Sequence, residues 1–499
     1  MDLFANLALG FEAALHPANL LYCFIGALFG TLIGVLPGLG PVATISMLLP
    51  LTFGLDPTAA LIMLAGIFYG AQYGGSTTAI LINLPGESSS VVTALDGHQM
   101  ARQGRAGVAL ATAALSSFFA GTVATIVIAL FAPPLAEIAV RFTAVEYFSL
   151  MALGLVAAIV LASGAVLNAV GMALLGLLLG LVGADINSGV PRFAFGMLEL
   201  ADGIDFVVVA MGLFAVAEVV RNLENPGERE IMVAKVKGLM PNREELRQMA
   251  PPAVRGTILG SILGILPGGG AILASFASYV LEKRISRHPE RFGKGAIEGV
   301  AGPEAANNAG AQTSFIPMLT LGIPSNPVMA LMIGAMIIQG VQPGPTVMTE
   351  QPALFWGVIA SMWVGNLFLV LLNLPLIGIW VSLLRVPYRQ IFPVIVFFSA
   401  IGVYSIGNST FDIWMLAVFG LVGYVLVKLG GEPAPLLLGF ILGPMIEEYF
   451  RRAMQISRGD PMVFLTRPVS AVLLALALGL IVMAALPKMR QGREEAFSE

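Results

Sequence analysis

Uncharged apolar stretches run through most of the sequence, at residues 108–132, 165–184, 355–384 and 469–486. A helix needs about 20 such residues to cross the ~30 Å hydrocarbon core of a bilayer. The composition agrees, because 57% of the residues are hydrophobic and only 11% are charged, against about 25% charged in soluble proteins. The sequence therefore predicts an all-α polytopic membrane protein with roughly 11 to 14 spanning or half-spanning helices.

Two of the apolar stretches are interrupted by a similar motif. Residues 30–41 read "GTLIGVLPGLGP" and residues 260–271 read "GSILGILPGGGA", with six of twelve positions identical at an offset of 230. Proline and glycine break helices, so a purely structural span has little use for them. A second match follows in the same order: "GAQ" occurs at 70–72 and at 310–312, and the proline turns "LPGES" and "IPSNP" come after it. These ordered matches indicate an internal duplication.

The basic residues predict how the two copies are oriented, because Lys and Arg in short loops favour the cytoplasmic side. In the first copy, the loop "LPLTFGLDPT" after the Pro-Gly motif has neither, whereas the loop "DGHQMARQGRAG" after the proline turn has two arginines. In the second copy the order is reversed, since residues 281–294 hold five basic residues and residues 295–384 hold none. The copies are therefore expected to be inserted upside down relative to each other, as in many secondary transporters.

The two sides of each Pro-Gly motif have the same charge character. Lys and Arg are absent around the first motif, whereas Arg255 and Lys283 flank the second. This favours re-entrant hairpins over spans, and arms such as 256–266 and 271–281 are too short to cross alone. We expect two inverted repeats, each with a re-entrant helical hairpin and a broken transmembrane helix. The hairpin tips, at 37–40 and 267–270, are expected to meet near the midplane.

A polar stretch divides the chain near its middle, where residues 221–255 hold seven Lys or Arg and five Glu. We expect a first membrane repeat with additional helices at 1–220, a polar cytoplasmic linker at 221–255, a second, inverted membrane repeat at 256–410, and C-terminal helices with a tail at 411–499. The first basic residue is Arg102, so the N-terminus lacks the basic start of a cleaved signal peptide.

Broken helices leave polar main chain inside the membrane, where it is tolerated if it is buried in protein or lines a wet cavity. Free amides at the positive ends of half-helices suit an anion such as a carboxylate, and freed carbonyls suit a cation such as Na⁺. The candidate substrate-binding residues are the hairpin tips and nearby polar side chains: Pro37, Gly38, Gly40, Ser76, Thr77, Thr78, Pro267, Gly268, Gly269, Thr313, Ser314, Ser325 and Asn326. The candidate cation-coupling residues are Asn83, Pro85, Gly86, Asn307 and Asn308, with backbone carbonyls near Gly38, Gly86, Gly268 and Ser325 as possible Na⁺ ligands.

Structural roles compete with binding at several positions. Isolated glycines such as Gly26 and Gly180 favour close helix packing, and individual Ser, Thr and Asn residues also cap broken helices. Glu87 lies at a break, where a binding role and a place at the cytoplasmic mouth stay equally open. Glu304 follows a basic loop, which favours a surface or helix-capping role over a coupling role. Structural pairing, for example with Arg192, is favoured for the acidic residues that border apolar spans: Asp185, Asp202, Asp205 and Glu218.

Other functional classes lack their motifs. The sequence has no G-x-x-x-x-G-K-[ST] phosphate loop and no H-E-x-x-H. Its three histidines lie far apart, its one cysteine, Cys23, is expected to be a small core residue, and its net charge of −4 implies no nucleic-acid partner. The "GGST" around Ser76 resembles a nucleophile setting only superficially, so an intramembrane hydrolase is a weak alternative. A gated anion channel stays open, although paired broken helices around a central site favour alternating access.

Four long segments carry a family resemblance. They are residues 34–110, with "GVLPGLGP" and "GAQYGGSTTAILINLPGESSS", residues 192–219, residues 302–345, with "GPEAANNAGAQTSFIPMLTLGIPSNP", and residues 436–460. Together they resemble the large membrane subunit of the tripartite tricarboxylate transporters. The family's Pro-Gly, "NNA" and "PG" positions fall on Pro37, Gly38, Pro267, Gly268, Asn307, Asn308, Pro85 and Gly86. The second copy departs from the pattern at Ser325, where a glycine is more usual, so this residue narrows the turn or supplies a hydroxyl.

The resemblance implies a function beyond what the residues alone indicate. It implies a symporter in a bacterial inner membrane that imports di- or tricarboxylates or related organic anions, with Na⁺ or H⁺ as the coupling ion and no other cofactor. It also implies a small membrane subunit, a periplasmic solute-binding protein that delivers the substrate, and an elevator-like movement of the domain that holds the two hairpins. The protein is accordingly not expected to be an enzyme.

Overall fold

The structure is a computed structural model, and it describes residues 3–36, 40–84, 86–162, 165–185, 188–224, 236, 238–266, 270–384 and 388–485. Helices dominate these residues, and one antiparallel pair of two-residue strands accompanies them, β1 (Gly183–Ala184) and β2 (Pro191–Arg192). Within the described residues, six helical segments are long and apolar enough to cross a membrane, and six shorter apolar helices accompany them. This agrees with the prediction of an all-α polytopic membrane protein.

The core of the predicted first repeat contains α2 (Pro17–Gly34), α3 (Pro41–Leu48), α4 (Pro57–Ile82) and α5 (Val91–Met100). A proline at the first position begins each of α2, α3 and α4, because that position needs no amide donor. The side chain of Asp56 caps α4 by accepting a hydrogen bond from the Thr58 amide. α4 ends at Asn83, which adopts the left-handed conformation with φ 56°. The predicted break in this helix is therefore present.

The core of the predicted second repeat contains α11 (Arg243–Leu263), α12 (Gly270–Ile285), α13 (Glu298–Thr313), α14 (Phe315–Leu321) and α15 (Pro327–Ile338). α14 ends at Gly322, which has φ 69°, and α15 begins after Asn326, whose side chain accepts from the Met329 amide. The second break thus lies between Gly322 and Asn326. α11 begins well before the expected arm start at 256, because Asn242 and Glu245 form a reciprocal capping box at its first turn. The C-terminal part of the expected linker is therefore helical.

The two repeats use the same glycine packing at matching positions. In each repeat, three glycines spaced four residues apart face backbone carbonyls of the neighbouring helix, and a Cβ added at any of them would lie 2.2–2.5 Å from a carbonyl oxygen. The glycines Gly26, Gly30 and Gly34 of α2 face Met63, Ile67 and Ala71 of α4, and Gly256, Gly260 and Gly264 of α11 face Gly302, Ala306 and Gly310 of α13. The matching offsets support the internal duplication, and they confirm the packing role expected for Gly26.

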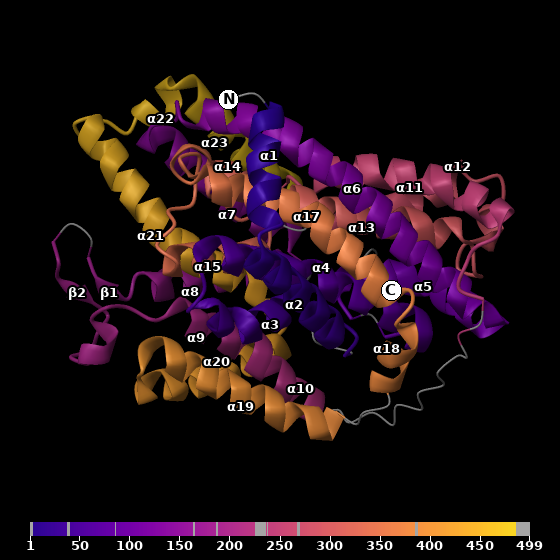
Figure 1. The fold of residues 1–499 in the computed structure, drawn as a ribbon. Coiled ribbons are helices and arrows are strands. Elements are labelled where there is room, and N and C mark those ends of the chain that lie inside the picture. The colour runs from indigo at the N-terminus through magenta and orange to yellow at the C-terminus, as the bar shows by residue number, and fades with distance from the viewer. Residues whose placement is uncertain are drawn as a thin grey trace.

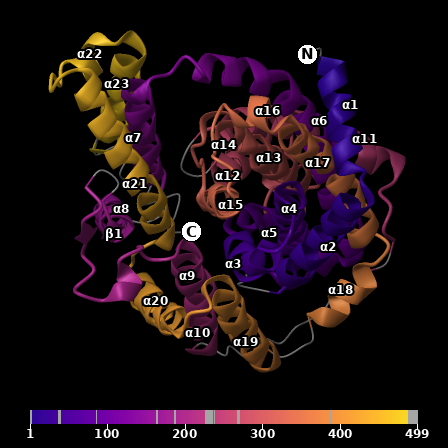
Figure 2. The same cartoon turned by 60° about the vertical axis from the view of Figure 1, so that its left-hand side comes forward.

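In Figure 2, α3 to α5 and α12 to α15 lie together near the centre, and most of the other helices lie around them. α17 (Pro352–Asn373) packs on α1, α2, α4 and α6, and α21 (Pro433–Ile456) packs on α7 and α8. The other elements are α1 (Leu3–Ala14), α6 (Ala106–Ala139), α7 (Ala144–Leu161), α8 (Val166–Gly180), α9 (Phe206–Ala210), α10 (Ala217–Glu224), α16 (Val347–Glu350), α18 (Ile377–Leu383), α19 (Tyr388–Gly407), α20 (Thr410–Lys428), α22 (Val463–Thr466) and α23 (Pro468–Ala485). α6 continues from α5 through a π-helical turn at Ala101–Arg105, and another π-helical segment, Met211–Val216, joins α9 to α10.

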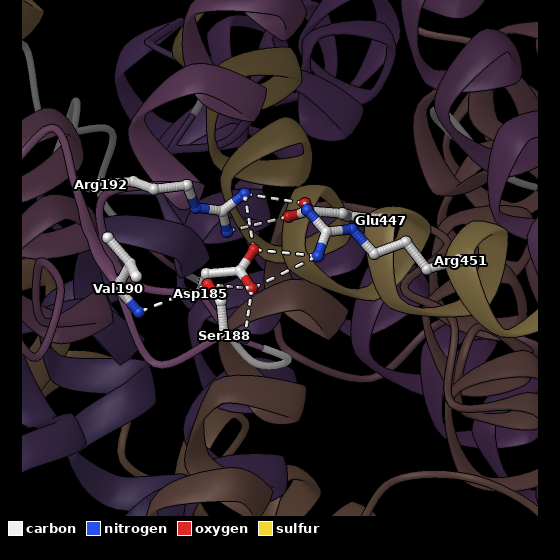
Figure 3. A network of polar contacts seen from close by, with 6 residues as sticks. All are labelled: Asp185, Ser188, Val190, Arg192, Glu447 and Arg451. Atoms are coloured by element: carbon white, nitrogen blue, oxygen red, sulfur yellow. Dashed lines mark hydrogen bonds and ion pairs between the residues drawn. The ribbon is translucent and has the colours of Figure 1, made fainter.

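An ion-pair network ties the projecting β1–β2 segment, seen at the left of Figure 1, to α21. The guanidinium of Arg192 contacts Glu447 at 2.7 Å and Asp185 at 3.5 Å, and Arg451 contacts Asp185 at 3.0 Å (Figure 3). The hydrogen bonds to Glu447 raise the pKa of Arg192 above its ordinary value. The structural pairing predicted for Asp185 with Arg192 is confirmed. Likewise Gly180 packs against the Phe440 carbonyl, and Cys23 is a buried core residue.

Candidate functional site

The first helix break lies against the end of α2, just before the first expected hairpin tip. Gly86 donates its amide to the Gly75 carbonyl at 3.4 Å, and a Cβ on Gly86 would lie 2.8 Å from the Gly34 carbonyl oxygen. The hydroxyl of Thr78 donates to the Val35 carbonyl at 3.2 Å. Three of the predicted site residues here lie outside the described residues: Pro37, Gly38 and Pro85. The described neighbours nevertheless bring the first break and the α2 end into contact.

The second break repeats this contact with different chemistry. Ser325 occupies the position that Gly86 has in the first repeat, and its hydroxyl donates to the Ser314 carbonyl at 3.3 Å. Each break is thus held by a hydrogen bond to a backbone carbonyl, that of Gly75 in the first half and that of Ser314 in the second. The Ser325 hydroxyl is thus bonded to the protein backbone in this structure.

The ends of the second hairpin arms lie close together. A Cβ on Gly270 would lie 2.7 Å from the Cα of Gly264, and one on Gly264 would lie 2.3 Å from the Thr313 hydroxyl. The end of α11 therefore meets both the start of α12 and the end of α13. The predicted tip residues Pro267, Gly268 and Gly269 lie outside the described residues, so the tip itself stays a prediction.

Glu304 lies at the centre of a polar cluster between the two halves of the chain. Its side chain is buried on α13, with 1% of the residue surface exposed. Three hydroxyls from the first half of the chain donate to its carboxylate: Thr93 at 2.5 Å, Ser76 at 2.9 Å and Ser117 at 3.2 Å. They come from α5, α4 and α6, respectively. Four helices from both halves therefore converge on one carboxylate.

The two neighbouring asparagines extend this cluster in two directions. Asn308 donates to the Ser117 hydroxyl at 2.7 Å, and Asn307 donates to the Glu87 carboxylate at 3.0 Å. Asn307 also accepts a long hydrogen bond, 3.4 Å, from Gln72 of α4. The two carboxylates, Glu87 and Glu304, are thus connected through one turn of α13. Glu87 is half-buried at the edge of this polar cluster, and both roles left open for it, substrate binding and a place at the cytoplasmic mouth, stay predictions.

A cavity borders the Glu304 carboxylate. Its lining combines polar residues with an apolar wall: Tyr73, Ser76, Thr77, Ser117, Glu304, Asn373, Leu110, Ala113, Ala114 and Ile377. The polar residues come from α4, α6, α13 and the end of α17. A buried carboxylate that is hydrogen-bonded to neutral hydroxyls beside a cavity is the kind of group that marks ion pathways in membrane proteins.

The expectation of a surface or capping role for Glu304 is wrong. The residue lies within α13 rather than at its start, and it is buried because the helix packs on α4, α5, α6, α11 and α12. A signal was present, since Glu304, Asn307 and Asn308 are spaced i, i+3 and i+4 and so share one helix face. The basic loop before the helix, which ends at Lys294, instead favoured a surface position for Glu304.

Sequence reasoning also missed side chains that complete the site. Thr93, Ser117 and Asn373 lie outside the quoted motifs, and no local pattern distinguishes them from packing residues. Tyr73 lies within "GAQYGGSTT" but was not among the predicted site residues. Other expected site residues lie elsewhere. Asn83 is exposed at the end of α4, and the side chain of Asn326 caps α15.

Side-chain hydroxyls near the breaks mostly bond to their own helix. Thr77 donates to the Tyr73 carbonyl, Thr313 to the Ala309 carbonyl, and Ser314 to the Ala311 carbonyl. Such bonds use the proton of the hydroxyl and leave its oxygen free to accept or to ligate. Gly40 begins α3, and a Cβ there would lie 3.7 Å from the Gly86 carbonyl oxygen. This glycine is thus part of the same junction as the first break.

The sequence matches one family model over most of its length. The model described as "Tripartite tricarboxylate transporter TctA family" matches residues 20–438. The chain belongs to the TctA family. This assignment confirms the resemblance seen in the sequence, and it makes the chain the large subunit of a tripartite transporter rather than an enzyme. Tripartite assembly implies that further subunits act with it.

Two relatives of this TctA chain are named by their position beside another gene. The chain is 63% identical over 499 residues, 100% of its own length and 99% of the relative's, to the "Uncharacterized 52.8 kDa protein in TAR-I ttuC' 3'region" of Agrobacterium vitis. It is 64% identical over 240 residues, 48% of its length and 99% of the relative's, to the "Uncharacterized protein in TAR-II ttuC' 3'region" of the same organism. No solved structure matches the chain.

Proposed function

We propose that this TctA-family chain is the translocating subunit of a cation-coupled symporter that imports di- or tricarboxylates or related organic anions across a bacterial inner membrane. A periplasmic solute-binding protein supplies the substrate, and a small membrane subunit completes the complex. The observation that carries this proposal is the buried polar site centred on Glu304, which side chains from both repeats build. Family membership alone supports the accompanying subunits.

Contacts between loops support the inverted orientation of the repeats. The two loops without Lys or Arg meet, since Gln339 donates to the Thr52 carbonyl at 2.6 Å. The basic loops also meet, since Gln103 donates to the Lys294 carbonyl at 2.8 Å and Arg105 pairs with Glu245 at 2.8 Å. Each loop therefore touches the loop of the other half that the charge rule assigns to the same side of the membrane. Inverted insertion accounts for both pairings at once.

The electrostatics of the site support cation coupling. A carboxylate substrate that approaches Glu87 and Glu304 meets negative charge in a medium of low dielectric constant, where like charges repel strongly. Cations that bind together with the substrate cancel this repulsion, so substrate and cation favour each other's binding. A channel for anions has no comparable use for a buried carboxylate at Glu304 and a half-buried one at Glu87. Asn307 and Asn308, which lie between the carboxylates, are candidates to hold both ligands.

Substrate carboxylates are proposed to bind the amides at the hairpin ends, near Gly40 and Gly270. Both glycines lie at helix starts, where free amides and the helix dipole favour an anion. The close approach of Gly264 and Gly270 suits a re-entrant hairpin, because two arms that end together at one depth leave no span between them. Elevator-like movement of both hairpins with the Glu304 site would then expose one site alternately to each side.

Uptake by the reconstituted complex tests the proposed function. Proteoliposomes with the full chain, its small subunit and the cognate binding protein are given labelled citrate and C4-dicarboxylates, with and without an inward Na⁺ gradient. We expect accumulation above equilibrium only when a cation gradient and the binding protein are both present. Carboxylate flux that is unaffected when every ion gradient is dissipated would support a gated channel and overturn the symporter.

A further inference from the structure

The cavity beside Glu304 has the oxygen ligands that a small cation requires. The carboxylate oxygen Oε2 of Glu304 contacts the hydroxyls of Ser76 and Ser117 at 2.9 and 3.2 Å, and all three residues line the cavity. Thr77 also lines the cavity, and its hydroxyl donates a hydrogen bond to the Tyr73 carbonyl at 3.2 Å, which leaves its oxygen free to bind a cation. One charged and three neutral oxygens are therefore available on the walls of one small space.

Asn373 provides an independent sign that this space holds a ligand. Asn373 is only 4% exposed, and its side-chain nitrogen Nδ2 donates a hydrogen bond to the Leu369 carbonyl at 2.9 Å. Its side-chain oxygen Oδ1 is buried and has no hydrogen-bond partner among the residues that the structure describes. A buried polar atom left without a partner costs roughly 1–3 kcal/mol. Since Asn373 lines the same cavity as Glu304, a cation there would satisfy both groups.

The charge of the site selects a monovalent ion. Glu304 is the one carboxylate that lines the cavity, and its charge balances a single positive charge. Ca²⁺ and Mg²⁺ sites gather further carboxylates or waters, and the described residues contain no group of three or more His, Cys, Asp or Glu placed to hold a metal ion. Hydroxyl, amide and carboxylate oxygens are hard ligands of the kind that Na⁺ prefers.

We propose that Na⁺ binds in this cavity, with Glu304 as its charged ligand and Ser76, Ser117, Thr77 and Asn373 as neutral oxygen ligands. The site differs from the backbone carbonyls near the helix breaks, which the sequence indicated for Na⁺. It joins α4 and α6 of the first half to α13 and α17 of the second, so the bound cation bridges the two halves. The assignment rests on the proposed function for its role in coupling, but Na⁺ binding itself can be measured without any carboxylate substrate.

Thermal stability of the purified full chain in detergent tests the site. Wild-type protein is heated in NaCl or in choline chloride at equal ionic strength, and the Na⁺ concentration is varied. We expect the midpoint of unfolding to rise saturably with Na⁺, because a ligand of the folded state stabilises it. Glu304→Gln should abolish the shift, and Asn373→Ala should raise the Na⁺ concentration for half of the shift about tenfold, the equivalent of about 1.4 kcal/mol of binding free energy.

The matched control is Glu146→Gln, which alters another buried carboxylate, at the start of α7 and away from the cavity. This variant should keep the full Na⁺ response. Asn373→Ala keeps the test valid if Glu304→Gln fails to fold, because Asn373 offers its oxygen to no described partner. Equal midpoints in NaCl and choline chloride for the wild type, or an unchanged Na⁺ response in Asn373→Ala, would overturn the site. A Na⁺ response without carboxylate uptake would instead leave the site standing and refute the proposed function.

Discussion

At the scale of single residues, the two repeats hold their helix breaks with hydrogen bonds from different donors. Each break must be tied to the helix that precedes it, and the carbonyl of Gly75 or Ser314 accepts the bond in each case. Gly86 uses its backbone amide, which requires close approach to Gly75, and Ser325 uses its side chain. The second repeat therefore has room for a Cβ where the first has none.

This asymmetry predicts unequal effects of exchanging the two residues. Gly86→Ser should prevent stable folding, because a Cβ there would lie 2.4 Å from the Cα of Gly75 and 2.8 Å from the Gly34 carbonyl oxygen. Ser325→Gly removes one hydrogen bond, which should cost about 1 kcal/mol. Size-exclusion chromatography and thermal unfolding of both purified variants provide the measurement. Equal yields and equal unfolding midpoints would contradict the packing described for the first break.

At the scale of helices, close glycine contacts hold α2 against α4 and α11 against α13. Membrane helices gain little from the hydrophobic effect when they associate, so van der Waals contact between close backbones is a main source of their attraction. The glycines at matching positions allow that contact in both repeats. The packing also positions Glu304, because α13 presents one face to α11 and its polar residues to α4, α5 and α6.

A methyl group at this interface should therefore be destabilising. In Gly260→Ala, the Cβ would lie 2.2 Å from the Ala306 carbonyl oxygen, so α11 and α13 must separate at a cost of about 1–3 kcal/mol. Gly171→Ala is the matched control, because this helical glycine has nothing within 4 Å of an added Cβ and alanine favours helix by up to about 1 kcal/mol. Thermal unfolding should show a lower midpoint for the first variant and an equal or higher one for the second. Similar midpoints would argue against tight packing of α11 on α13.

At the scale of the whole molecule, the loops of the two halves gather by charge. Basic loops contact basic loops, and loops without Lys or Arg contact each other. The distribution of Lys and Arg among the loops also decides which loops stay on the cytoplasmic side. The contacts between loops and the membrane topology should therefore agree.

Cysteine labelling of intact cells measures that topology. The native Cys23 is buried, so wild-type protein should react little with a membrane-impermeant maleimide. Cysteines placed at the exposed positions Phe53 and Gln342 should be labelled from outside, whereas those at Gln103 and Glu290 should react only after the membrane is opened. The proposal fails if Phe53 and Glu290 are labelled from the same side, because these positions follow equivalent motifs and the repeats would then not be inverted.

The sequence by itself determined the helical membrane class, the internal duplication and the places where helices break. These features follow from local chemistry: a proline lacks an amide, a glycine lacks a Cβ, and an uncharged stretch of sufficient length partitions into lipid. The glycine faces could also be located, because their spacing of four residues is a property of one helix.

Only the tertiary structure decided where Glu304 lies and what surrounds it. Its hydroxyl donors stand 211, 228 and 187 residues away in the sequence, at Thr93, Ser76 and Ser117, and Asn373 joins them from the end of another helix. A carboxylate remains in the membrane interior when enough donors converge on it, and that convergence depends on how distant helices pack. No local pattern contains this information, which is why the basic loop before Glu304 suggested a surface position and the packing of four helices gave a buried one.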